Sequence, residues 1–133
     1  MNNNIYVFNK FKTIAEVCNE LFLTNYQSSL RKSWFTPNTF KKTPLEDYSV
    51  WFPKFELNKA NWVNKLINNG KEIISRNDTE KGKAKIGQRN ITFTNTGKEY
   101  IYAGIFELIR KDADETEHWK RISDKCVIFA KLK

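Results

Sequence analysis

The fold is decided by the stretch EYIYAGIFELIR, residues 99–110. Its aromatic and branched residues run for about twice the usual strand length. Gly104 lies at the middle, and a glycine inside a strand commonly marks a bulge or a sharp bend. A long strand bent at a glycine can form two walls of a small barrel. Just upstream, residues 91–93 and the turn at 95–97 predict an antiparallel hairpin whose second arm is 98–110.

Other strands are predicted on both sides of this hairpin, at residues 5–8, 48–57 (bent or interrupted at Pro53), 72–75 after the Asn69-Gly70 turn, and 125–131. Two helices are predicted. Thr13 and Glu16 form a capping-box pattern ahead of apolar residues at helical spacing in 14–23. Asn58 is the expected cap of a short helix that contains Ala60, Trp62, Val63, Leu66 and Ile67.

These elements predict an α+β fold, a curved, mostly antiparallel β-sheet or small β-barrel flanked by two helices. We expect one domain over residues 1–133. Residues 1–47 supply a strand, a helix and an aromatic loop, and residues 48–133 supply the barrel-like part.

The composition limits the class of protein. The 133 residues are 40% hydrophobic and 14% aromatic, which is enough for a folded core and excludes a disordered chain. No apolar run reaches the roughly 18 residues that a membrane span needs. The N-terminus does not have the pattern of a signal peptide. We therefore expect a cytoplasmic protein without a membrane partner, either a monomer or a homodimer.

The formal charge of +8 excludes an acidic DNA mimic and points to a polyanionic partner. An acid-free stretch carries the basic residues Lys81, Lys83, Lys85, Arg89 and Lys98. Basic loops of this kind neutralise phosphates, so these five residues are the first candidates for nucleic-acid binding. Two other interpretations stay open: a solvated loop, and the codon bias of an AT-rich genome, which would also explain 18 Lys against 5 Arg.

No motif in the sequence predicts catalysis. There is no nucleophile elbow, P-loop or dinucleotide fingerprint. His118 follows an acidic run that we expect to be an exposed loop, and Asp47 and Glu56 are expected to be surface charges. Cys18 and Cys126 lie far apart, so we expect two buried thiols, no metal site and no cofactor.

The large aromatic residues have two interpretations. Trp34, Phe35 and Phe40 lie in an irregular stretch, residues 24–43, and Tyr100 and Tyr102 share one face of the long strand. Such rings either pack into the core or line a surface on which bases stack. The sequence favours the core for most of them.

Two segments together resemble a known module. They are VWFPKFE (50–56), with NWVN (61–64) and NGKEII (69–74), and YIYAGIFEL (100–108), with WKRIS (119–123) after an acidic loop. Their order and spacing resemble the small β-barrel of the PUA/SRA/EVE-like kind found in bacterial restriction-type proteins, over about residues 48–131. The resemblance implies a DNA reader, in some members one that flips a modified base into an aromatic cage. It makes Trp51, Trp62, Tyr102 and Trp119 pocket candidates and Arg121 a phosphate or base contact.

The function that we predict is therefore a non-enzymatic nucleic-acid-binding module, for DNA rather than RNA, in bacterial restriction or its phage counterpart. Recognition of a modified or flipped base is part of this prediction. One alternative is a phage or mobile-element anti-defence inhibitor that binds a host protein or a small signalling nucleotide. An enzyme built on His118, or on Asp47 and Glu56, is a third alternative.

Overall fold

The computed structural model describes residues 3–5, 10–22, 24–35, 48–53, 62–77, 84–95 and 98–128, with the backbone alone at 3–5, 62, 63, 77 and 126–128. The elements follow in the order β1 (Asn3–Ile5), β2 (Lys10–Phe11), α1 (Ile14–Leu21), β3 (Trp34–Phe35), β4 (Tyr48–Trp51), β5 (Trp62–Ile67), β6 (Glu72–Asn77), β7 (Arg89–Asn95), β8 (Tyr100–Lys111), β9 (Glu117–Ser123) and β10 (Cys126–Ile128).

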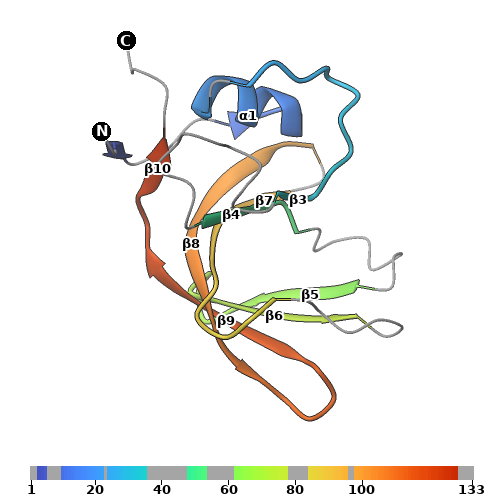
Figure 1. The fold of residues 1–133 in the computed structure, drawn as a ribbon, viewed down its shortest axis with the longest axis vertical. Helices are drawn as coiled ribbons and strands as arrows, with labels where there is room; N and C mark the ends of the chain where they lie inside the picture. Colours follow the sequence, from blue (N-terminus) through green and yellow to red (C-terminus); the bar gives the residue numbers. More distant parts are fainter. Residues whose placement is uncertain are drawn as a thin grey trace.

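One sheet dominates the structure, in the strand order β3-β4-β7-β8-β9-β6-β5, with β2 paired to the start of β8 (Figure 1). Strands β1 and β10 form a separate antiparallel pair. All pairs are antiparallel except β4 with β7, so the prediction of a curved, mostly antiparallel sheet is confirmed. The barrel alternative is wrong for the part of the chain that the structure describes, because β3 and β5 remain unpaired edges of an open sheet.

The predicted bend at Gly104 is confirmed. Its φ is +129°, in a region that residues with a side chain rarely adopt. The pairing of β7 with β8 shifts register opposite this glycine, between Thr92 and Phe93. The pairing of β8 with β9 shifts just beyond it, between Ile105 and Phe106. Such irregularities increase local twist and bend a strand, so β8 can curve through the whole sheet.

The sheet curls until distant strands meet across its inner face. β4 and β9 are separated by β7 and β8, which would place them about 14 Å apart in a flat sheet. The ring centroids of Trp51 on β4 and Trp119 on β9 are nevertheless only 5.3 Å apart. We call the side of these two rings the inner face and the opposite side the outer face.

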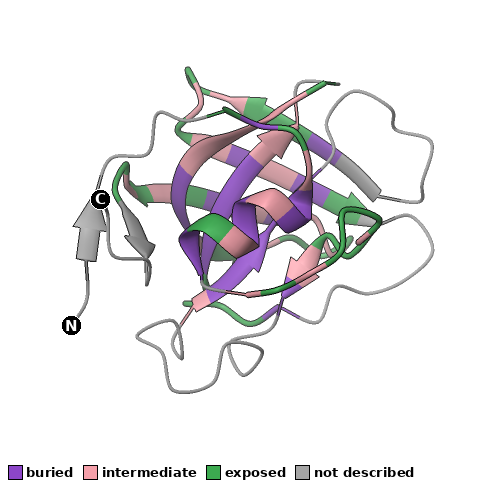
Figure 2. Ribbon diagram, turned by 90° about the horizontal axis from the view of Figure 1, so that it is seen from above, coloured by how far each residue is buried: buried purple, intermediate pink, exposed green. Residues whose placement is uncertain are grey.

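The outer face is covered by α1 (Figure 2). Thr13 caps this helix, because its hydroxyl accepts a hydrogen bond of 3.0 Å from the Glu16 backbone N–H, as the sequence predicts. The helix buries Ile14, Val17, Cys18 and Leu21 against Val50, Phe52, Ile91, Phe93 and Ile105 of the sheet. Cys18 is fully buried, which confirms the predicted buried thiol there, and this burial raises the pKa of the thiol to about 12. The side chain of Cys126 lies outside the described residues.

The predicted second helix is wrong. Residues 62–67 form β5, which pairs with β6 over six residue pairs, from Trp62↔Asn77 to Ile67↔Glu72. The apolar spacing of this segment suits either structure, and the turn decides between them. Asn68, Asn69 and Gly70 all have positive φ, and this reversal makes a tight hairpin of β5 and β6. Within the described residues, α1 is the one helix.

Strand boundaries differ from the predictions in small ways. β1 covers residues 3–5 and β10 covers 126–128, while residues 6–9 and 129–131 lie outside the described part. β4 ends at Trp51, two residues before Pro53. In the described residues, no helix is long and apolar enough to cross a membrane.

Candidate nucleic-acid interface

Three tryptophans come together on the inner face. Trp34 lies 5.8 Å from Trp51 and 6.2 Å from Trp119 between ring centroids, both in edge-to-face geometry. Trp51 is 7% exposed and Trp119 is fully buried, whereas Trp34, on the edge strand β3, is half-buried. Two of the predicted pocket residues, Trp51 and Trp119, are thus in contact. Trp34 is the ring of the three that offers a free surface.

Beside these rings the sheet buries polar side chains. Ser49, Asn90 and Thr92 are all 0% exposed. They lie on β4 and β7, with Ser49 paired to Asn90 and Asn90 paired to Phe106 of the inner face. The Thr92 hydroxyl is satisfied, since it donates to the Asn90 backbone carbonyl over 3.2 Å.

Asn90 is the exception among these groups, because its side-chain Nδ2 is buried and has no hydrogen-bond partner among the described residues. Its Oδ1 accepts a long hydrogen bond of 3.4 Å from the Gln88 Nε2. Leaving a buried amide donor unsatisfied costs about 1–3 kcal/mol. Such a group in a folded protein calls for an explanation, and a ligand acceptor is one of the few available.

The turn at residues 85–88 connects these buried polar groups to the protein surface. The Gln88 N–H donates to the Lys85 carbonyl over 2.9 Å, and the Gly87 N–H donates to the Leu108 carbonyl over 2.8 Å. Within this turn Lys85 is exposed, and Ile86 is the most exposed large hydrophobic residue described, at 59%. The turn therefore presents a cation and an apolar tip, while Gln88 at its end reaches the buried Asn90.

Arg121 lies across Gly104 on the inner face. Phe106 of the inner face pairs with Arg121, and a Cβ atom on Gly104 would lie 2.6 Å from the Arg121 Cδ. The nearby carboxylate of Glu107 pairs with Arg89 at 3.0 Å, and Arg121 has no ion pair with any described residue.

Glu117 is a buried carboxylate at the start of β9, not part of the predicted acidic loop. It is 4% exposed, and its Oε1 accepts a hydrogen bond of 3.2 Å from the Trp119 indole N–H. Burial raises its pKa, which the Trp119 hydrogen bond and Lys111, at 3.9 Å, partly offset.

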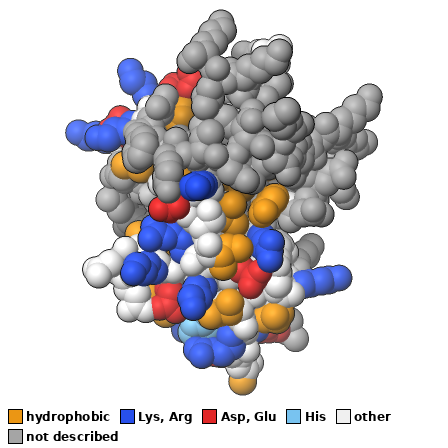
Figure 3. Space-filling model, turned by 90° about the vertical axis from the view of Figure 1, so that its left-hand side faces the viewer, with side chains coloured by type: hydrophobic (Ala, Val, Ile, Leu, Met, Phe, Trp, Pro, Cys, Tyr) orange, Lys and Arg blue, Asp and Glu red, His pale blue; other side chains and the backbone are white. Residues whose placement is uncertain are grey.

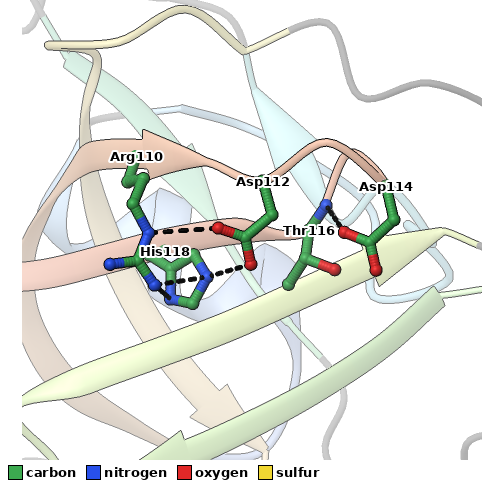
Figure 4. A network of polar contacts seen from close by, with 5 residues as sticks. All are labelled: Arg110, Asp112, Asp114, Thr116 and His118. Carbon is green, nitrogen blue, oxygen red and sulfur yellow. Dashed lines mark hydrogen bonds and ion pairs between the residues drawn. The ribbon is translucent and has the colours of Figure 1, made fainter.

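His118 is also placed differently from the prediction of an exposed loop. It lies within β9, and its side chain is only 18% exposed. Its Nε2 lies 2.8 Å from the Asp112 Oδ2, and one Arg110 nitrogen lies 3.1 and 3.3 Å from the two ring nitrogens (Figure 4). An atom in the ring plane at these two distances would overlap the carbon between the nitrogens, so the guanidinium lies over the ring face. The His118 hydrogen bond lowers the pKa of Asp112.

Of the five predicted basic residues, the structure describes Lys85, Arg89 and Lys98, which are spread along β7. Lys81 and Lys83 lie outside the described residues. Lys85 is in the turn before β7, whereas Lys98 follows β7, about 20 Å away along a seven-residue strand. Arg89 lies between them, next to Asn90 in the strand, so its side chain points to the outer face. On the face shown in Figure 3, the described Lys and Arg side chains are interspersed with acidic and hydrophobic ones.

The other two predicted pocket residues are Tyr102 and Trp62. Tyr102 packs on Phe93 of the outer-face core, at 5.2 Å, and its hydroxyl donates to the Lys125 carbonyl over 2.7 Å. Trp62 belongs to β5, but its side chain lies outside the described residues.

Sequence reasoning missed Asn90, Ser49 and Gln88. In a strand of alternating character, the polar positions are normally those that face water, so Asn90 and Thr92 gave no signal of burial. The alternation of Asn90 and Thr92 with Ile91 and Phe93 is the same whether the inner face is exposed or covered, so it does not reveal their burial.

Comparison with known proteins agrees with this fold. Among solved structures, the chain is similar to the 5-hydroxymethylcytosine-specific restriction enzyme AbaSI, with a TM-score of 0.71 and 22% sequence identity. The similarity covers 96% of this chain and 43% of that one, so the chain spans less than half the length of that enzyme. No curated protein matches the chain by sequence. The profile of the SRA domain, the SET and RING associated domain, matches residues 2–128. The chain therefore belongs to the SRA family.

Proposed function

We propose that this chain is a DNA-reading module that takes a flipped, modified base onto its inner face. The observation that carries the proposal is the Nδ2 of Asn90, which is buried and finds no hydrogen-bond partner in the part of the chain that the structure describes. A base presents ring nitrogens and carbonyl oxygens as acceptors along its edge, and an enclosed base would give this donor a partner. Membership of the SRA family supports DNA as the ligand.

The tryptophan cluster supports a planar ligand at the same place. Trp51 on β4 and Thr92 on β7 are paired residues, two positions along from Ser49 and Asn90. Trp34, next to Trp51, is half-buried, so part of this residue is accessible to a stacking base. Stacking on such a ring contributes about 1–3 kcal/mol per base.

The turn at Lys85–Gln88 supports contact with a duplex. Its exposed cation can neutralise a phosphate. Its apolar tip, Ile86, is suited to enter the stack where a base has left it, as apolar wedges do in proteins that distort DNA. Arg121, with no ionic partner among the described residues, supplies a second cation on the inner face.

The structural relative is named for 5-hydroxymethylcytosine, and for this chain we propose a cytosine modified at C5 as the base that it reads. The biological setting that we propose is bacterial restriction, with the chain as the reading component.

The test is binding to duplexes that differ at one cytosine, which is plain, 5-methylated or 5-hydroxymethylated, measured by fluorescence anisotropy at two salt concentrations. We expect tighter binding to a modified duplex, and affinity that falls as salt rises. Asn90→Ala should remove the preference for the modified base, whereas Asn25→Ala, at an exposed position, should not. Arg121→Ala should weaken binding to all duplexes and reduce the salt dependence. Binding that shows no preference for a modified duplex would refute the proposal, and so would normal binding by Asn90→Ala.

A further inference from the structure

We propose that Gln88 fixes the orientation of the Asn90 side-chain amide. Asn90 then presents its NH₂ group as a hydrogen-bond donor, and the bound base must offer an acceptor. This inference rests on the proposed function. Gln88 is a positioning residue in it, because it acts on the base through Asn90.

The two ends of a side-chain amide have nearly the same shape, so their orientation is decided by their partners. At Asn90 the oxygen end faces Gln88, whose Nε2 lies 3.4 Å from the Asn90 Oδ1. The nitrogen end is then fully buried on the inner face, with no hydrogen-bond partner in the described ranges of the chain. Whichever end Gln88 holds, the other end is presented to a ligand.

The orientation of Gln88 is in turn fixed by a backbone group. The Lys85 N–H, at 3.4 Å from the Gln88 Oε1, is a donor and can be nothing else. A reversed Gln88 amide would place its NH₂ against this N–H, with two donors facing each other. The Gln88 Nε2 is thereby directed to its two acceptors, the Ser49 hydroxyl at 3.0 Å and the Asn90 Oδ1.

Two hydrogen bonds therefore connect the backbone of the exposed turn to the buried Asn90 amide. The Lys85 N–H donates to the Gln88 Oε1, and the Gln88 Nε2 donates to the Asn90 Oδ1. It predicts a ligand edge with a ring nitrogen or a carbonyl oxygen at Asn90. It also links base reading to the turn that carries Lys85 and Ile86, since the turn holds the fixed donor at its start and Gln88 at its end.

Gln88→Glu tests this directly, because a carboxylate has the same shape and only accepts. It keeps the hydrogen bond from the Lys85 N–H but attracts the Asn90 Nδ2, so the Asn90 oxygen turns toward the base. We expect Gln88→Glu to lose about tenfold in affinity for the preferred duplex, because this corresponds to the loss of one hydrogen bond. Gln88→Met, which only frees Asn90 to rotate, should lose less, about threefold.

Two controls separate polarity from charge and from structure. Gln27→Glu adds the same charge at an exposed position and measures the general repulsion of DNA. In an Asn90→Ala background, Gln88→Glu should cost no more than Gln27→Glu does, because there is no amide left to turn. A merely structural role would make Gln88→Met the more damaging change and its effect independent of Asn90.

The outcomes keep the two proposals distinct. If the unmodified protein shows no preference for a modified duplex, or if Asn90→Ala binds normally, the proposed function fails. If Asn90→Ala loses the preference but Gln88→Glu behaves like Gln27→Glu, the DNA-reading function stands and the role of Gln88 is overturned.

Discussion

The side chain of Arg121 occupies the space that a Cβ atom on Gly104 would need. Such an atom would lie 2.6 Å from the Arg121 Cδ, 2.9 Å from its Cγ and 2.7 Å from the Ser123 carbonyl oxygen. The position of the Arg121 side chain on the inner face therefore depends on the absence of a side chain at residue 104, as the bend in β8 does.

Gly104→Ala should lower the free energy of unfolding by about 2–4 kcal/mol, because it combines a positive φ with a clash against backbone. Urea denaturation measures this loss. Gly87→Ala is the matched control, since its φ is also positive but nothing lies within 4 Å of the added atom. It should cost only about 1–2 kcal/mol. Equal losses in the two variants would show that the contact with Arg121 and Ser123 contributes nothing.

Glu117→Gln should raise the free energy of unfolding at pH 7 by about 1 kcal/mol, because the variant has no carboxylate to bury. The folded-state pKa of Glu117 is raised above its ordinary value of 4.5. Its protonation therefore favours the folded state at low pH, and this contribution is lost as pH rises through the folded-state pKa. The advantage of the variant should shrink as pH falls toward 4.5. Urea denaturation between pH 4 and 7 measures this, and an advantage that stays constant with pH would contradict it.

The free energy of unfolding of Cys18→Ala should be lower than that of the unaltered protein at pH 9, and this difference should become smaller as the pH rises to 12. The thiol pKa is raised from 9.0 to about 12 in the folded protein, so only the unfolded chain ionises in this range, which favours unfolding. The Ala variant lacks this effect, although it starts less stable because of the cavity that it creates.

In the unaltered protein, iodoacetamide at pH 8 should label Cys18 only after urea is added, as mass spectrometry would show. Rapid labelling without urea would mean that the thiol is accessible.

Local signals predicted the parts of the fold that depend on local chemistry. The cap at Thr13, the helix after it and the hairpin of β7 and β8 each follow from a few neighbouring residues, and so does the bend at Gly104. The segment Trp62–Ile67 was misassigned because its apolar spacing fits two structures. The choice between them depends on β6, with which it pairs.

The site was predicted only in part, because it depends on the curl of the sheet. Trp51 and Trp119 were identified as large aromatic residues, and the curl brings them together. Asn90 and Glu117 are buried, although polar residues in strands of alternating character normally face water. Likewise, Lys85 and Lys98 are close in sequence and lie at opposite ends of a strand.

The pairing of β1 with β10 joins Asn3 to Ile128 and Ile5 to Cys126, and this has a consequence for synthesis on the ribosome. The first strand has no partner until residues 126–128 have left the exit tunnel, which at roughly 5–20 residues per second is on the order of ten seconds after the first strand is made. The curled sheet can assemble from β4 to β9 before that. We therefore expect β1 and β10 to pair last, after the sheet between them has assembled.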